Sequence, residues 1–249
     1  MCTLIALHRT VPGYDLVIGM NRDEDRLRPA EPPQLLPGPP PLVAPRDARA
    51  GGTWLGVNEP GLFAALSNRR GKQSNTARSR GLLVLEVLKG AHVRAAQITL
   101  ERETAQHEVN FFNLVAATRE EMRFFVYDGA LRMARGHEGL NVMTNAGGNV
   151  EGDEKVATIR SMAGEAKWSG GEAAVHWLES SLRHHGGTGS TALCGHFPGG
   201  GTVSSTILAL HNGDPDQHVL LHASGSPCEN PYRAYSHLLR SLKPGRASG

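Results

Sequence analysis

Apolar and polar residues alternate along many short stretches of this chain, which is the pattern of β-strands that bury one face. The first two stretches cover residues 2–8 and 14–21, and the turn Val11-Pro12-Gly13 between them predicts that the chain begins with a hairpin. The alternation continues later in the chain, which we interpret as strands at 53–58, 61–67, 109–118, 122–127, 131–135, 140–144, 191–194, 203–210 and 218–222.

Helical periodicity, with apolar residues three and four positions apart, occurs in two separate blocks. The predicted helices cover 79–88 and 92–106 in the first block and 154–163 and 172–184 in the second. Strands and helices thus come in groups instead of alternating singly. This order predicts an α+β protein with mainly antiparallel sheets, helices layered on their faces, and an antiparallel meander from 109 to 144.

Prolines crowd the segment 28–52, where eight of them lie between Pro29 and Pro45. Proline lacks the backbone N–H that helices and central strands require, so we expect an extended or irregular loop here. The sequence shows no internal repeat and no linker. We therefore expect a single domain over residues 1–249, with a frayed tail at 243–249.

Charge and hydrophobicity exclude several function classes. The chain has 26 Lys and Arg against 24 Asp and Glu, a net charge of +2, and no long basic run, so no nucleic-acid partner is expected. Its apolar stretches are far shorter than the roughly 20 residues that cross a bilayer, so no membrane span is expected. Three cysteines and a first segment without a leader pattern favour a cytoplasmic location.

Cys2 has the clearest chemical potential, because removal of Met1 would leave its thiol beside a free α-amine. The unperturbed pKa of an α-amine is about 7.7 to 8.0, so this amine can act as a built-in base for the thiol. Such a pair is the basis of N-terminal nucleophile catalysis. The alternative is that Cys2 is a small buried hydrophobic residue at the start of a strand.

The second predicted strand leaves its apolar run through Asn21-Arg22-Asp23-Glu24. Strand alternation puts Asn21 and Asp23 on one face and Arg22 on the other. If this strand pairs with the first, a carboxylate here lies close to Cys2 and can orient its amine. We interpret Asn21 and Arg22 as candidate substrate-binding residues beside Asp23; the alternative is a solvated turn of mixed charges.

Several motifs together resemble one known family. They are Met1-Cys2-Thr3, Asn21-Arg22-Asp23-Glu24, Gly51-Gly52-Thr53-Trp54-Leu55-Gly56 and Asn58-Glu59-Pro60-Gly61-Leu62, followed less specifically by Thr202-Val203-Ser204-Ser205-Thr206 and Pro227-Cys228. Their order resembles the NRDE-motif family, also called the transport and Golgi organisation family, over nearly the whole chain. The resemblance implies a relationship to the N-terminal nucleophile hydrolases, and with it a four-layer αββα sandwich of two packed antiparallel sheets.

Within that superfamily the chain is similar to the choloylglycine hydrolase branch, which also begins Met-Cys-Thr. The branch's Gly-x-x-x-Asp spacing is matched by Gly19 and Asp23. Its Gly-x-Asn-Glu-x-Gly-Leu stretch is matched from Gly56 to Leu62, with Asn68 six residues later.

The resemblance implies a role for each matched residue. Cys2 would be the nucleophile, Asp23 the partner of its amine, and Asn68 a side-chain N–H donor to the developing oxyanion. Asn145 resembles the branch's other polar site asparagine. The alternatives are structural: Asn68 would cap its loop, and Asn145 would occupy a left-handed turn.

Two departures bear on the substrate. The branch carries an arginine where this chain has Met20, and Val203 stands where a late active-site arginine would be expected. A bile-salt-like or penicillin-like substrate is therefore not expected. Arg22 either pairs with a neighbouring carboxylate, Glu24 or Asp25, as a structural clasp or recognises a substrate carboxylate.

The histidines and cysteines later in the chain show no metal-site spacing. His184-His185 adjoin glycines in an expected loop, and Cys194-Gly195-His196 lacks paired ligands. From spacing alone we expect no metal site.

The sequence therefore predicts an N-terminal nucleophile hydrolase-like protein in which Cys2 attacks a small amide or thioester, with a small acyl compound as partner and no cofactor. The alternative on the same fold is a non-catalytic binding or trafficking protein for haem, a lipid or acyl-CoA, because the eukaryotic side of the family is associated with such hydrophobic ligands. A Cys-Pro dipeptide, invoked for haem contact, is absent, and the chain has Pro227-Cys228 instead.

Overall fold

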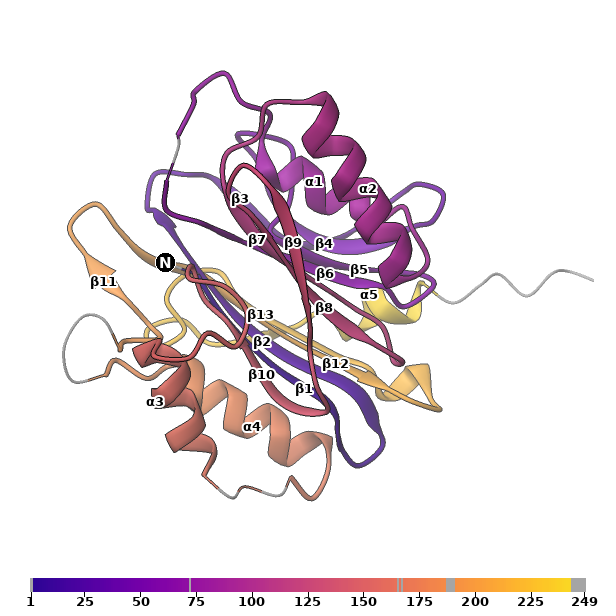
Figure 1. The fold of residues 1–249 in the computed structure, drawn as a ribbon. Helices are drawn as coiled ribbons and strands as arrows, with labels where there is room; N and C mark the ends of the chain where they lie inside the picture. The colour runs from indigo at the N-terminus through magenta and orange to yellow at the C-terminus, as the bar shows by residue number, and fades with distance from the viewer. Residues whose placement is uncertain (1, 72, 165, 167, 187–190, 243–249) are drawn as a thin grey trace, which may run out of the picture.

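The computed structural model describes residues 2–71, 73–164, 166, 168–186 and 191–242, and within them two antiparallel sheets pack face to face (Figure 1). The first sheet has the order β10-β1-β2-β12-β13-β14, and β11 also pairs with β12. Its strands are β1 (Thr3–Val11), β2 (Tyr14–Asp25), β10 (Gly139–Met143), β11 (His196–Phe197), β12 (Gly200–His211), β13 (Val219–Ala223) and β14 (Arg233–Ala234).

The second sheet runs in simple sequence order from β3 to β9. Its strands are β3 (Ala30–Leu36), β4 (Leu42–Asp47), β5 (Leu55–Asn58), β6 (Phe63–Asn68), β7 (Phe112–Ala117), β8 (Met122–Tyr127) and β9 (Leu131–Arg135). Each strand pairs antiparallel with its neighbour, so the middle of the chain forms one continuous meander.

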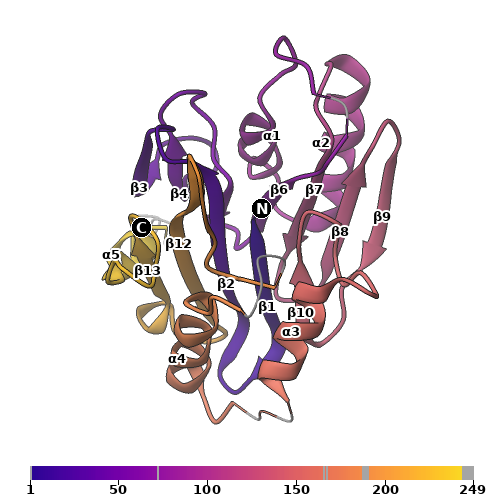
Figure 2. The same cartoon turned by 90° about the vertical axis from the view of Figure 1, so that its left-hand side faces the viewer.

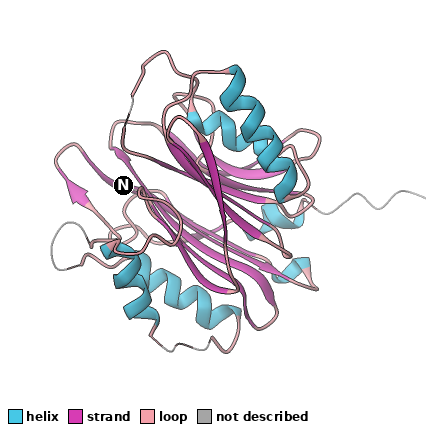
Figure 3. Ribbon diagram, in the orientation of Figure 1, coloured by secondary structure: helices cyan, strands magenta, loops and turns pink. Residues whose placement is uncertain are grey.

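Helices cover the outer face of each sheet (Figures 1 and 3). The second sheet carries α1 (Arg80–Val87) and α2 (Val93–Gln106), and the first carries α3 (Glu154–Ala163) and α4 (Gly171–Leu182). A short α5 (Ser236–Arg240) follows β14. The predicted four-layer αββα sandwich is confirmed. No helix in the described part of the chain is long and apolar enough to cross a membrane.

The alternation in β1 explains the layering. Leu4 and Ala6 face the second sheet, whereas Ile5 and Leu7 pack with α3 and α4, and all four are fully buried. Because β1 lies between β10 and β2, it has no free edge. Figure 2 shows that its start lies in the middle of the molecule, between the layers. The residue before β1 is thereby fixed where the two sheets meet.

The prediction of an irregular loop at 28–52 was wrong. This segment forms β3 and β4, and β4 pairs with strands on both sides. The prolines lie at positions where no backbone hydrogen bond between strands is lost. Pro32 and Pro33 occupy a register shift between β3 and β4, and Pro45 lies beyond the residues that pair with β5. A proline-rich strand is tolerated when its prolines fall at bulges and unpaired positions.

Two other predictions were also wrong, and one helix was missed. The strand predicted at 140–144 leaves the meander and pairs with β1 in the first sheet. Residues 191–194 are not a strand, and the short β11 follows them instead. Helix α5 was not predicted. The tail at 243–249 lies outside the described residues, as does Met1.

Gly52 is expected to tolerate no larger side chain. A Cβ at this position would lie 2.4 Å from the carbonyl carbon of Gly81, where the loop before β5 contacts the start of α1. The backbone N–H of Thr53 donates to the Gly81 carbonyl at 3.1 Å, so the two segments cannot separate without losing this bond. We expect Gly52→Ala to lower the free energy of unfolding by about 2 kcal/mol, measured by urea denaturation.

The matched control is Gly213→Ala, because a Cβ at Gly213 would meet its nearest atom, on His211, at 3.9 Å. Equal stability of the two variants would contradict the close approach of Gly52 to the Gly81 backbone.

Candidate functional site

Cys2 lies immediately before β1 and faces two cavities. It is 8% exposed, and its Sγ donates a long hydrogen bond of 3.9 Å to the backbone carbonyl of Asp23. The first cavity has a volume of about 360 Å³, and its lining also includes Trp54 and Asn68. The charged residues of that lining are Arg22, Asp23, Glu24, Arg28, Asp47, Arg78 and Arg80.

The environment of the Cys2 thiol favours its neutral form. Burial raises the pKa of Cys2, and the negative charge of Asp23 raises it further, against smaller opposing effects that include the hydrogen bond with the Asp23 backbone and the charge of Arg22. At neutral pH the thiol therefore stays protonated unless a base removes its proton. A nucleophilic role for Cys2 requires such a base within reach.

The Asp23 carboxylate is fixed by the neighbouring strand. Thr202, on β12, donates its hydroxyl proton to Asp23 Oδ1 at 2.6 Å. The same Thr202 oxygen accepts from the backbone N–H of Gly195 at 2.9 Å. Asp23 is 9% exposed and lines both cavities beside Cys2. The structure thus brings Cys2 and Asp23 together.

Arg22 reaches the same cavity as Asp23, although strand alternation predicted opposite faces. The pairing of β2 with β12 shifts register between Thr202 and Ser204, opposite these two residues, and such bulges redirect side chains. The Arg22 guanidinium lies 4.4 Å from the centre of the Trp54 ring and pairs with Glu24 at 3.7 Å. Burial lowers the pKa of Arg22, and its Nη1 has no partner among the described residues.

Asn21 does not reach the cavities. It is fully buried, and its Nδ2 donates to the carbonyls of Leu182 and Leu193, each at 2.8 Å. Asn21 thus joins β2 to the end of α4 and to the segment before β11. Its side chain lines neither of the two cavities around Cys2.

The second cavity, of about 220 Å³, brings Asn68 and Asn145 to Cys2 and Asp23. Asn68 is an exposed residue at the end of β6, and its carbonyl accepts from Asn145 Nδ2. The Oδ1 of Asn145 is buried and has no partner among the described residues. Asn113 holds the Asn145 loop by donating to the Asn145 carbonyl at 3.0 Å. All four predicted catalytic residues thus line one small cavity.

Sequence reasoning missed three residues of this site. Trp54 stacks on Arg22, and Thr202 holds Asp23; both lie in motifs that were noticed but given no role. Arg80, the first residue of α1, lines the larger cavity and donates to the Phe111 carbonyl at 2.9 Å. Burial lowers the pKa of Arg80. No local signal in the sequence pointed to Arg80.

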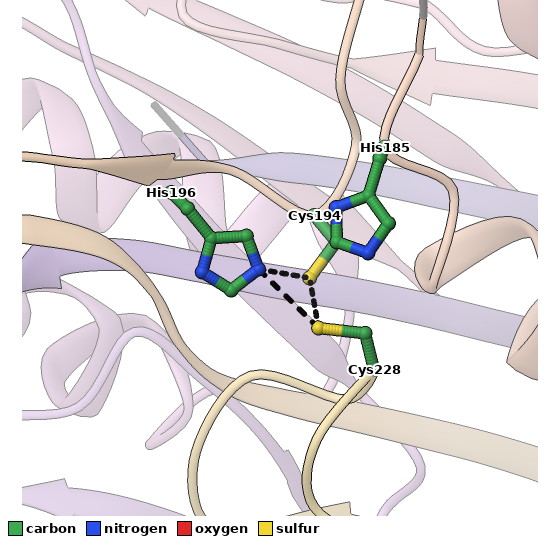
Figure 4. Close-up of side chains that lie close together, drawn as sticks. All are labelled: His185, Cys194, His196 and Cys228. Atoms are coloured by element: carbon green, nitrogen blue, oxygen red, sulfur yellow. Dashed lines mark hydrogen bonds between the residues drawn. The ribbon is translucent and has the colours of Figure 1, made fainter.

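A separate cluster of possible metal ligands lies at the start of β11 (Figure 4). Its members are His185, Cys194, His196 and Cys228, and their ligand atoms all lie within 4.8 Å of one another. Spacing alone had indicated no metal site here. Cys228 was missed because it reaches the cluster from a loop 34 residues further along the chain.

Two stacked antiparallel sheets with outer helices and a thiol before the first strand define an N-terminal nucleophile hydrolase-like fold. The structure resembles an N-acylethanolamine-hydrolyzing acid amidase ortholog from Caenorhabditis elegans, with a TM-score of 0.57 and 14% identity over 83% of this chain and 92% of that one. Penicillin V acylase from Agrobacterium tumefaciens gives a TM-score of 0.55 and 14% identity over 90% and 83%. A conjugated bile acid hydrolase from Clostridium perfringens gives 0.52 and 12% over 94% and 96%.

The chain belongs to the Transport and Golgi organisation 2 family, whose profile matches residues 1–186. The mouse Transport and Golgi organization 2 homolog is 32% identical over 108 residues, which are 42% of this chain and 39% of that protein. The bovine homolog is 35% identical over 109 residues, with the same coverage. The aligned region thus spans about 39% of the length of these curated relatives.

Proposed function

We propose that this protein is an N-terminal cysteine hydrolase that cleaves a small acyl amide or thioester. The observation that carries the proposal is the common cavity of Cys2, Asp23, Asn68 and Asn145. The known structures with this fold include an acid amidase, an acylase and a bile acid hydrolase, which supports acyl transfer as the reaction class.

Removal of Met1 would supply the missing base. The raised pKa of Cys2 means that its thiol needs a proton acceptor, and the α-amine of the mature residue 2 is attached to the same Cα. Asp23, held by Thr202, would bind this amine and keep it beside the sulfur. The role of Asp23 is thus to position the base.

In the reaction, the amine takes the thiol proton while Sγ bonds to the substrate's carbonyl carbon. The amine then returns that proton to the leaving nitrogen or sulfur as the C–N or C–S bond breaks. Water attacks the resulting thioester, which frees the acid and regenerates the thiol. The donors assigned to the oxyanion of both steps are the side-chain N–H of Asn68 and the second Nδ2–H of Asn145, whose first is bonded to the Asn68 carbonyl.

The larger cavity favours a substrate with an anionic group. Its lining holds four arginines against three carboxylates. Two of these arginines, Arg22 and Arg80, have pKa values lowered by burial, so an anion beside them would offset the cost of their desolvation. The Nη1 of Arg22, which has no partner in the described part of the chain, is a donor available to a carboxylate or sulfonate.

The charged lining gives less support to the alternative function. A haem macrocycle or a lipid chain requires a mostly apolar wall, and seven charged residues line the cavity nearest Cys2. A binding or trafficking role for haem, a lipid or acyl-CoA therefore ranks second.

Intact-mass spectrometry tests the proposal. Purified protein is incubated with N-acyl amino acids, with the same compounds after conversion of the carboxylate to a neutral amide, and with acyl thioesters. We expect a protein mass that lacks Met1 and gains one acyl group, with peptide mapping that locates the group on Cys2. The anionic compounds should react faster than their neutral counterparts.

Two results would contradict this function. One is a protein that retains Met1 in its native form, since the required amine is then blocked. The other is an acyl group that maps to a residue other than Cys2.

A further inference from the structure

Three segments that are distant in sequence meet in the cluster of His185, Cys194, His196 and Cys228 (Figure 4). His185 follows α4, and Cys228 lies in the loop after β13. Cys194 precedes β11, and His196 is the first residue of that strand. None of these residues lines the two cavities around Cys2. Figure 4 shows the two sulfurs and the His196 ring directed toward one another.

The distances suit a single tetrahedral ion. The two sulfurs are 3.4 Å apart, and His196 Nε2 lies 3.3 Å from Cys228 Sγ and 3.9 Å from Cys194 Sγ. Zinc bonds of about 2.3 Å to sulfur and about 2.0 Å to nitrogen place tetrahedral ligands about 3.5 to 3.8 Å apart. The observed separations bracket these values.

The fourth ligand and the access route are also present. His185 offers the fourth ligand, because its ring nitrogen lies within 4.8 Å of the other three ligand atoms, and its ring stacks on that of His196 with centres 5.2 Å apart. Cys194 is buried, whereas both histidines are exposed, so an ion can reach the sulfurs from solvent.

We propose that His185, Cys194, His196 and Cys228 bind one Zn²⁺ ion in a structural, four-coordinate site. Two thiolates and two imidazoles select zinc over calcium or magnesium, which prefer oxygen ligands. On binding, each thiol releases its proton to solvent, and both sulfurs and one nitrogen of each ring bond to the ion.

The ion would stabilise the two segments that hold Thr202, the residue that fixes Asp23. Gly195, between two of the ligands, donates its N–H to Thr202 Oγ1, and Thr202 in turn donates to Asp23. On the other side, Ser226, two residues before Cys228, donates to the Thr202 carbonyl at 2.7 Å. The zinc site thus joins the two segments that hold Thr202, and its effect on Asp23 is one of positioning.

Metal analysis of the purified protein tests this site. Protein made without chelator is expected to contain about one zinc per chain by inductively coupled plasma mass spectrometry. After removal of the metal under reducing conditions, Co²⁺ is expected to produce the sulfur-to-cobalt charge-transfer band of a thiolate site. This band reports coordination independently of any enzyme activity.

Ligand variants with matched controls complete the test. Cys228→Ser and His196→Gln are expected to lower Zn²⁺ affinity by at least about 100-fold, since even the loss of an outer partner costs 10 to 100-fold. His184→Gln, a neighbour of the cluster in sequence, and Cys2→Ala should bind Zn²⁺ like the wild type. His196 is exposed, so its variant is expected to fold even if Cys228→Ser does not.

Two outcomes would overturn the proposal. The first is reduced wild-type protein that takes up no Zn²⁺ or Co²⁺. The second is a pair of ligand variants that bind Zn²⁺ as tightly as the wild type. If the protein is two hydrogens lighter before reduction and binds no metal afterwards, the cysteines form a disulfide and the zinc site does not exist.

Discussion

Replacement of Cys2 by alanine is expected to abolish turnover and to lower kcat by at least about 10³-fold, because no other group supplies the attacking sulfur. The stability of the fold should change little, since Cys2 lies before β1 and contributes no backbone pair to the sheet. Steady-state kinetics on the most reactive acyl compound measures the loss. Thermal unfolding of both proteins checks that the fold is retained.

Cys2→Ser is the matched variant for this experiment. Serine and alanine are both small, so Met1 is removed equally well from both, and serine keeps a weaker nucleophile in the same place. The serine variant should accumulate an acyl-enzyme slowly, and the alanine variant should form none. Turnover by Cys2→Ala above a tenth of the wild-type rate would exclude Cys2 as nucleophile.

Replacement of Asp23 by asparagine is expected to have the second largest effect, with kcat/KM lower by about 10³-fold. In this variant the pKa of the Cys2 thiol is expected to fall, although a nucleophile that has lost activity is usually expected to have a raised pKa. The charge of Asp23 raises the pKa of Cys2, so its removal lowers that pKa and increases the thiolate fraction at neutral pH. Turnover nevertheless falls, because the α-amine loses its partner.

The pH dependence of thiol alkylation measures the pKa of Cys2 in Asp23→Asn, in parallel with kcat/KM. Asp25→Asn removes the same charge from an exposed position on the same strand and should leave both values unchanged. An Asp23→Asn variant with a higher thiol pKa, or with wild-type turnover, would exclude the assigned role of Asp23.

The N-terminal hairpin shows how much of the site local sequence pattern can predict. Alternation indicated two paired strands. Val11 lies opposite Tyr14 at the turn, but a bulge between His8 and Val11 shifts the register by one residue, so that Thr3 lies opposite Asn21. Pairing through the hairpin was enough to predict that Asp23 lies near Cys2, whereas the bulge that sets the exact register was not predicted. The same local logic predicted the blocks of strands and helices that form the layers.

Long-range pairing could not be predicted in this way. The strand β10 has the same alternation as its neighbours in sequence, and only its packing decides that it joins β1 rather than β9. Asn21 was predicted to lie beside Asp23 and bind substrate. Its side-chain amide instead donates hydrogen bonds to carbonyls that lie 161 and 172 residues later in the chain. Local periodicity contains no information about such partners.

The central position of β1 has a practical consequence for recombinant production. Cys2 lies directly before β1, the strand between β10 and β2, and lines both cavities, so residues added ahead of it are expected to compete with a ligand for this space. An affinity tag or fusion partner at this end would fill the space meant for a ligand. Purification handles therefore belong at the opposite terminus, beyond α5.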